Sequence, residues 1–339
     1  MTEDRASENR RQASHKRKIV DFLTRNPESS ALAVALMLVI VFAAASGGVW
    51  LNTGNLQSVL HVTSVLAILA IGEALVICTG EIDISIGSVF GIGAFVFLGF
   101  APVLGVTPAL FLAIGSGGLI GAFNGYVSSY FGVSSLITTL GTLFIFRGIA
   151  FLLTEGFAFS IPTATREELA FYSWFGSGTI FGFQNSIVWV VLLALVIHIA
   201  VFFTPFGNQL LAIGGHRESA LSRGVRVRFV RLMAFVLAGA LAAFAGVLEA
   251  NKTGFADASS GRLMELEAIA ACVVGGCLLS GGRVTIIGVV AGALILSGIQ
   301  SFLVIMGVTP QLYLMVLAVL VIFALLGDSQ FRGWAARQR

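Results

Sequence analysis

Charged residues are scarce in this chain: Lys, Arg, Asp and Glu make up only 11% of its 339 residues. A typical soluble domain carries about 25% charged residues, and a soluble fold of this size needs far more polar surface than this chain can supply. The scarcity argues against a cytosolic enzyme, a nucleic-acid binder and a secreted domain. The net charge of +3 is also too small to indicate a nucleic-acid partner.

Cysteine and lysine are rare too, and several chemical patterns are missing. The three cysteines, Cys78, Cys272 and Cys277, lie in apolar runs without metal-ligand neighbours, so we interpret them as packing residues. The four histidines also have no metal-ligand companions nearby. No Gly-x-x-x-x-Gly-Lys-Ser/Thr loop exists, so the chain cannot bind ATP in the P-loop manner. We predict no catalytic residue, no metal ligand and no cofactor.

Apolar residues are abundant instead, at 57% of the chain, together with 40 glycines. A helix needs about 20 apolar residues to cross the hydrocarbon core of a membrane. Ten runs come near that length: 31–50, 57–79, 84–101, 107–130, 134–153, 186–204, 230–249, 265–280, 284–304 and 309–327. The sequence therefore predicts an all-α, polytopic transmembrane bundle of about ten spans over residues 31–327. A long continuous run is also not the alternating pattern of a β-barrel strand.

The basic residues predict the orientation of this bundle. Fifteen of the 20 lie in an N-terminal arm (1–30), a loop (205–231) and a C-terminal tail (328–339). The positive-inside rule places all three in the cytoplasm. Six spans separate the arm from the loop and four separate the loop from the tail, and both numbers are even, as this placement requires. The charged arm is too long for a cleavable signal peptide, and we expect its first residues to be disordered or to contact membrane lipid.

Residues 80–88 interrupt the apolar pattern with two carboxylates, Glu81 and Asp83, between glycines. Apolar and polar residues alternate here, and this period does not continue a helix. One interpretation is a broken helix near the translocation path, because irregular backbone and charge at membrane depth usually mark a pathway. The alternative is a tight cytoplasmic turn in which Asp83 or Ser85 caps the next helix. The candidate residues of this segment are Glu81, Asp83, Ser85 and Gly87.

A second glycine-rich interruption covers residues 275–283 and predicts a weak internal repeat. A constant offset aligns Gly80 with Gly275, Ser85 with Ser280 and Gly87 with Gly282. Paired glycine-interrupted segments in two halves point to a transporter core, so we add Gly275, Gly276, Ser280 and Gly282 to the candidate path. Arg283 is either a partner for a carboxylate or phospholipid, or a plain cytoplasmic charge. Glycines elsewhere in the spans are expected to allow close helix packing.

The 205–231 loop contains its own helix signals. Residues 216–223 have a capped start, small residues and a glycine stop. They predict a short helix on the cytoplasmic face that can dock in a groove of a soluble partner.

Three stretches resemble the permease subunits of bacterial ABC importers for simple sugars, the ribose, xylose and galactose permease family. They are Gly80–Ser88, Ser135–Gly148 (SLITTLGTLFIFRG) and Glu265–Gly288 (ELEAIAACVVGGCLLSGGRVTIIG). The first is similar to the family's Gly-Gly-Ile-Asp-Leu-Ser-Val-Gly-Ser signature, with Glu81 in place of the second glycine. The resemblance covers residues 30–327.

This resemblance implies a multi-pass permease of the bacterial inner membrane that imports a monosaccharide. It implies separate ABC ATPase subunits, a periplasmic sugar-binding protein and a second permease copy, in a homodimer or a heterodimer. The loop after the sixth span contacts the ATPase in this family, which assigns coupling to Arg217, Glu218, Ser219, Ala220 and Gly224. Glu167, Glu168 and Lys252, in the outer loops 155–185 and 250–263, are candidate docking charges for the binding protein.

Other functions fit parts of the sequence. Permeases for branched-chain amino acids or nucleosides look similar to this chain. An ion-driven secondary transporter or channel is a different class, in which Glu81 and Asp83 hold a proton or sodium ion. The basic loop and the family motifs argue against it. An intramembrane enzyme is the remotest alternative, because no nucleophile–base pair is visible.

Overall fold

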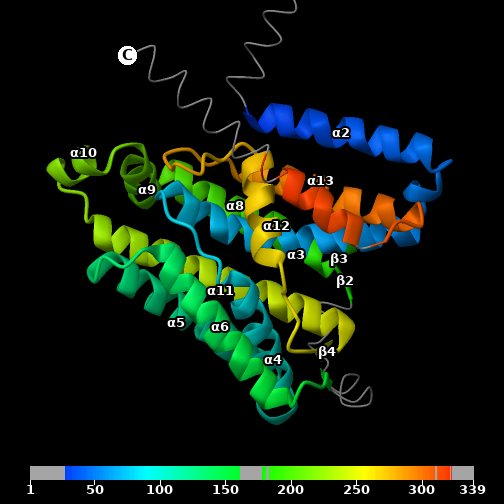
Figure 1. The fold of residues 1–339 in the computed structure, drawn as a ribbon, viewed down its shortest axis with the longest axis horizontal. Coiled ribbons are helices and arrows are strands. Elements are labelled where there is room, and N and C mark those ends of the chain that lie inside the picture. The colour runs from blue at the N-terminus through cyan, green and yellow to red at the C-terminus, as the bar shows by residue number, and fades with distance from the viewer. Residues whose placement is uncertain (1–26, 161–177, 181–182, 310, 321, 323–339) are drawn as a thin grey trace, which may run out of the picture.

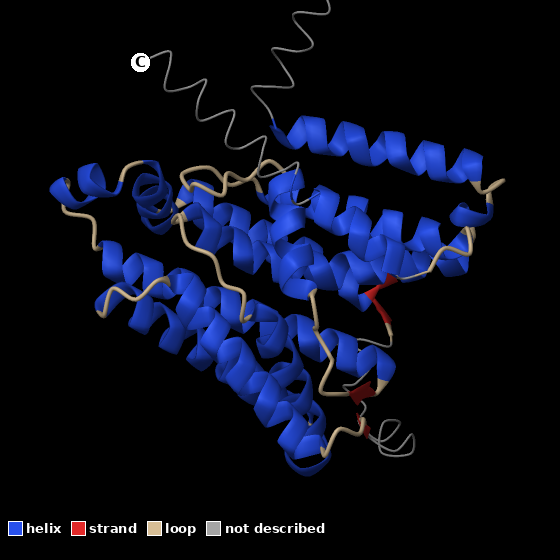
Figure 2. Ribbon diagram, in the orientation of Figure 1, coloured by secondary structure: helices blue, strands red, loops and turns tan. Residues whose placement is uncertain are grey.

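The computed structural model of the chain describes residues 27–160, 178–180, 183–309, 311–320 and 322. Helices form nearly all of this part (Figure 2). They are α2 (Pro27–Ala45), η1 (Val49–Leu51), α3 (Thr53–Cys78), α4 (Ile86–Leu104), α5 (Val106–Tyr130), α6 (Ser135–Thr154), α8 (Asn185–Phe203), α9 (Pro205–Gly215), α10 (Arg217–Ser222), α11 (Val227–Thr253), α12 (Met264–Val274) and α13 (Ile286–Ile305). A further short helix covers Gln311–Leu320.

Eight of the described helices are long and apolar enough to cross a membrane: α2, α3, α4, α5, α6, α8, α11 and α13. This confirms the predicted all-α, polytopic bundle. The predicted span 265–280 differs, because α12 has only 11 residues. At 1.5 Å per residue it is about 16 Å long, roughly half of the hydrocarbon thickness. The helix ends here because Gly276 has a φ of +94°, which a continuing right-handed helix does not allow.

The core is organised around α3. Of the most apolar 18-residue stretch of this helix, 89% is buried in the protein. Helix α11 packs against α5, α4 and α3, and α13 packs against α3, α12 and α2. In Figure 1, α12 crosses the direction of α3 and α13 partway along their length. Helix α12 is therefore an internal half-helix within the bundle.

The contact between α5 and α11 is unusually close and depends on glycine. A Cβ atom on Gly121 would collide with the backbone carbonyl of Phe235, and one on Gly239 would collide with the carbonyl of Gly117. Small residues let two helix backbones approach to this distance. The predicted role of these glycines in helix packing is confirmed for Gly117 and Gly121, whereas Gly115 faces open space.

The two ends of the bundle carry different connections. Helices α9 and α10 lie at one end, on the left in Figure 1. The described strands lie towards the other end: β1 (Phe159–Ser160) pairs antiparallel with β4 (Phe255–Ala256), and β2 (Thr179–Ile180) pairs antiparallel with β3 (Phe183–Gln184). We call these the α10 end and the strand end. The predicted cytoplasmic loop 205–231 and the predicted outer loops thus belong to opposite ends.

Candidate functional site

The first interruption, residues 79–85, leaves α3 at the α10 end and runs into the bundle to the start of α4. Gly80 adopts a φ of +81°, which turns the chain out of α3. Two side chains near the start of α6 accept hydrogen bonds from the extended backbone that follows Gly80. The hydroxyl of Ser135 accepts from the N–H of Ile82 (3.4 Å), and the hydroxyl of Thr139 accepts from the N–H of Ile84 (3.2 Å). The start of the Ser135–Gly148 motif therefore holds this connection in place.

Asp83 organises the start of α4. Its Oδ1 accepts from both the N–H (2.9 Å) and the hydroxyl (2.6 Å) of Ser85, the N-cap residue of α4. Asn124 of α5 donates to the same hydroxyl at 2.8 Å. All three side chains are buried, and burial raises the pKa of the Asp83 carboxyl to about 6. The expected capping of this helix by Asp83 or Ser85 is not found: Ser85 is the N-cap residue but its side chain makes no capping bond, and Asp83 accepts from Ser85 itself and not from an N–H of the first helical turn.

Glu73 is a functional candidate that the sequence reasoning missed. It is fully buried in α3, and its Oε1 accepts from the N–H of Asp83 at 3.1 Å. A single carboxylate inside a long apolar run was the available signal, because such a residue costs several kcal/mol unless it has a partner. The hydrogen bond ties the last turns of α3 to the connection that follows it.

Glu81 forms an ion pair with Arg231 of α11. The Arg231 side chain is 6% exposed and the Glu81 side chain is 22% exposed. Arg217 of α10 lies close enough to Arg231 for electrostatic repulsion. The pair therefore joins the first interruption to α11 directly beside α10.

The second interruption, residues 275–285, lies against the first. The N–H of Gly282 donates to the carbonyl of Cys78 at 2.9 Å. Gly281 and Gly282 have φ values of +87° and +80°, and Gly214 of α9 packs on the same carbonyl. The two segments that the repeat paired in sequence thus meet in space. Arg283 donates from Nε to the carbonyl of Gly276 at 3.1 Å.

Helix α10 (Arg217–Ser222) confirms the short helix expected over 216–223. The ring nitrogen Nδ1 of His216 accepts from the N–H of Ser219 and caps the start, and Gly224 ends the segment with a φ of +80°. Arg217, Glu218 and Ser219 are exposed, whereas Ala220 is buried against the bundle. Figure 1 shows α10 at the outer edge of the fold. The helix thus presents a charged face outward and one small residue inward.

Of the three predicted docking charges, the structure describes only Lys252. Glu167 and Glu168 lie outside the described residues. Lys252 lies in the last turn of α11, at the strand end, and Glu249 attracts it electrostatically.

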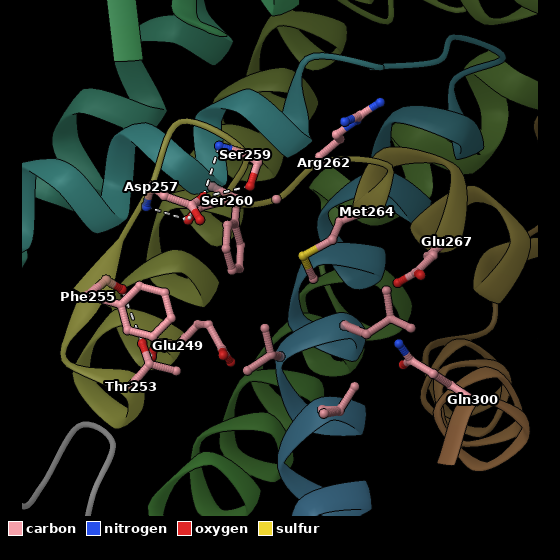
Figure 3. Close-up of a pocket in the computed structure, with 15 residues that line it drawn as sticks. Glu249, Thr253, Phe255, Asp257, Ser259, Ser260, Arg262, Met264, Glu267 and Gln300 are labelled. Atoms are coloured by element: carbon pink, nitrogen blue, oxygen red, sulfur yellow. Dashed lines mark hydrogen bonds between the residues drawn. The ribbon is translucent and has the colours of Figure 1, made fainter. Parts of the chain in front are cut away.

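A cavity of about 410 Å³ lies in the bundle next to the start of α12 (Figure 3). Its lining residues come from five helices and the loop between α11 and α12: Val62, Val65, Leu66, Phe90, Glu249, Thr253, Phe255, Asp257, Ser259, Ser260, Gly261, Arg262, Met264, Glu267 and Gln300. Ligand sites usually measure about 300–1,000 Å³ and combine apolar walls with a few placed polar groups. None of the candidate path residues of the two interruptions lines this cavity, so their part in translocation stays a prediction.

The loop wall of the cavity is held by Arg147 of α6. Its Nη1 donates to the carbonyls of Ala258 (3.0 Å) and Ser260 (2.7 Å). Asp257 closes the same loop on itself by accepting from the N–H and the hydroxyl of Ser259 (2.9 and 2.8 Å). Gly87 lies against the Gly261 carbonyl, so the loop reaches the first turn of α4. Arg147 belongs to the Ser135–Gly148 motif, which therefore contacts both the α3–α4 connection and the cavity wall.

Metal chemistry has no visible basis in the part of the chain that the structure describes. No group of three or more His, Cys, Asp or Glu side chains is placed there to hold a metal ion. The polar side chains described above are instead hydrogen-bond partners, and Glu81 and Arg231 form an ion pair.

Comparison with known proteins gives matches over most of the chain. Residues 55–325 match the family described as "Branched-chain amino acid transport system / permease component". The autoinducer 2 import system permease protein LsrC of Salmonella typhimurium is 34% identical over 294 residues, which cover 85% of this chain and 81% of that protein. The ribose import permease protein RbsC of Escherichia coli K12 is 31% identical over 299 residues, covering 88% and 92%. No solved structure matches.

Proposed function

The chain belongs to this family of ABC-importer permeases and is a multi-pass protein of the inner membrane, and from this premise we propose that it imports a neutral monosaccharide. The observation that carries the proposal is the similarity to a ribose import permease over 88% of this chain and 92% of that relative. The low content of charge inside the spans agrees with an uncharged cargo.

The proposed energy source is a pair of separate ATPase subunits that dock on α10. The exposed Arg217, Glu218 and Ser219 supply the polar contact, and the buried Ala220 joins the helix to the bundle. Movement of α10 reaches α11 through Arg231 and the α3–α4 connection through Glu81. Discrete packed elements that shift as rigid bodies transmit such motions.

A periplasmic binding protein is proposed to deliver the sugar at the strand end, where Lys252 lies. Glu167 and Glu168 are further docking candidates. A second permease copy, identical or similar, completes the transport unit, and membrane lipid contacts the N-terminal arm.

A second cargo class is favoured by one observation, namely that the family description names branched-chain amino acids.

The test of the two cargo classes is to purify the chain with the proteins that co-purify with it, reconstitute the complex and measure ATP hydrolysis. We expect stimulation by binding protein loaded with ribose, xylose or galactose. Stimulation by leucine-loaded protein alone supports the second cargo class, and no stimulation by either contradicts both proposed cargoes.

A further inference from the structure

The cavity beside α12 gathers carboxylate and amide groups from three different helices. Figure 3 shows Glu249 of α11, Glu267 of α12 and Gln300 of α13 reaching towards the same central space. Carboxylates accept hydrogen bonds and a side-chain amide both donates and accepts. Phe90 and Phe255 add aromatic surface to the wall. This mixture matches the surface of a monosaccharide, which carries several hydroxyl groups around an apolar ring.

The Glu249 carboxylate forms a hydrogen bond with a buried histidine, His61. The Nε2 of His61 lies 2.9 Å from Oε2 of Glu249, and its Nδ1 lies 3.1 Å from the hydroxyl of Ser186. Because a carboxylate only accepts, Nε2 donates to Glu249. His61 is 3% exposed, whereas the Glu249 side chain is 38% exposed. One carboxylate oxygen is thus fixed by α3 and α8, and the side chain keeps a surface towards the cavity.

The cavity adjoins another, mainly apolar cavity between α3 and α13. A second cavity of about 270 Å³ shares Val62 and Gln300 with it and is lined by Asn55, Ser58 and Ser301 at the far ends of α3 and α13. The hydroxyl of Ser301 donates to Oδ1 of Asn55 at 2.8 Å, which bridges these two helices. The two cavities thus share part of one wall.

The charge of the lining selects against anions. Glu249, Asp257 and Glu267 carry three negative charges, and Arg262 carries the only positive charge among the lining residues. In a partly desolvated site, this balance disfavours a phosphate or carboxylate ligand. A neutral ligand with several hydroxyl donors fits the excess of acceptors, and its binding does not require a charged ligand group to be desolvated.

We propose that this cavity is the substrate site of the permease, where Glu249 accepts hydrogen bonds from hydroxyl groups of a neutral, polyhydroxylated ligand. His61 acts as a positioning residue that orients Glu249 and does not itself contact the ligand. The inference rests on the proposed function and adds to it the residues that touch the cargo.

The first test uses the complete complex in proteoliposomes, with radiolabelled ribose, xylose and galactose as probes. Glu249→Gln lowers the transport rate about ten-fold, the loss expected for one charge-assisted hydrogen bond. ATP hydrolysis stimulated by the loaded binding protein stays within about two-fold of wild type, because α10 is far from the cavity. Glu28→Gln, a matched change in the first turn of α2, leaves both rates unchanged.

The positioning role of His61 is tested by two variants. His61→Gln keeps a donor near the position of Nε2 and retains most of the transport rate. His61→Leu removes the donor and lowers transport as Glu249→Gln does, and the double variant is no worse than either single one. Equal losses in the Gln and Leu variants would show that His61 matters only for packing.

Occupancy of the cavity is tested without transport. A thiol introduced by Gln300→Cys, in the chain held in lipid nanodiscs, reacts with a water-soluble methanethiosulfonate, whereas Cys78, Cys272 and Cys277 are buried. Ribose slows this reaction and leucine does not. Wild-type sugar transport combined with unchanged transport in Glu249→Gln contradicts the site alone. Transport of leucine and of no sugar contradicts the cargo, and protection by leucine in that case overturns the polyhydroxylated ligand while keeping the cavity as the substrate site.

Discussion

Glu81 and Arg231 are 150 positions apart in the sequence and form an ion pair between the α3–α4 connection and the second turn of α11. Neither side chain is more than a quarter exposed. Removing one partner from such a pair leaves a poorly solvated charge, which is more damaging than removing both. The pair is therefore a structural tie between the α3–α4 connection and α11.

Glu81→Ala is expected to lower the stability of the chain by about 3 kcal/mol, near the low end of the range for buried pairs. The double variant Glu81→Ala, Arg231→Met recovers part of this loss, because it removes the unpaired charge. Thermal unfolding in detergent measures both. Arg226→Met, at an exposed arginine of the same loop, is the control with no effect. Strictly additive effects of the two single changes would contradict the pairing.

Asp83→Ala is expected to destabilise the start of α4 by about 1–3 kcal/mol, because the buried N–H and hydroxyl of Ser85 lose their acceptor. Asp83→Asn keeps an acceptor oxygen and costs less. The midpoint of thermal unfolding in lipid nanodiscs ranks the two variants. If both lower it equally, the carboxylate acts through its charge and not through these bonds.

Arg147→Met is expected to loosen the loop between α11 and α12, since the carbonyls of Ala258 and Ser260 lose their donor. Hydrogen exchange of residues 255–263 increases, while exchange in α3 stays slow. Transport of the sugar falls because the loop forms one wall of the cavity. Unchanged exchange in this loop would remove the holding role of Arg147.

Gly121→Ala is expected to cost about 1–3 kcal/mol, the usual price of overpacking, because its methyl group meets the backbone of Phe235 in α11. Gly115→Ala is a matched control on the same helix, where the new methyl group meets open space. The difference between their unfolding midpoints measures the close helix contact. Equal behaviour of the two variants would show that α5 and α11 do not approach this closely.

Arg217→Glu is expected to uncouple ATP hydrolysis from transport without unfolding the chain, because Arg217 is exposed on α10. The ATPase rate then no longer responds to the loaded binding protein, and sugar uptake is lost. Glu28→Lys on α2 is the control for a charge reversal elsewhere. Full transport by the Arg217 variant would mean that α10 is not the coupling helix.

Most of the fold could be predicted because the membrane restricts the choices. Long apolar runs must become helices, and Gly80 and the capping pattern at His216 are local signals for a break and a helix start. The length of α12 is overestimated by hydropathy, because the apolar run continues past Val274. Gly276 and the glycines after it leave the helical conformation and end the helix there.

The site could be predicted only where its signals are local. The candidate residues around 80–88 and 217–224 stand out by composition. Partners such as Glu81 with Arg231, or His61 with Glu249, come from helices that are distant in sequence, so no spacing reveals them. The cavity is lined by five helices and the loop between α11 and α12, which no local sequence pattern brings together. Arg147 was visible as a motif residue, but its two carbonyl partners were not.

The most direct test of the central claim is ATP-driven sugar accumulation by proteoliposomes that contain this chain with its ATPase and binding protein. We predict that ribose, xylose or galactose accumulates only when all three proteins and ATP are present, and that Glu249→Gln reduces this accumulation about ten-fold. Uptake by the chain alone, driven by an ion gradient and independent of ATP, would contradict the account.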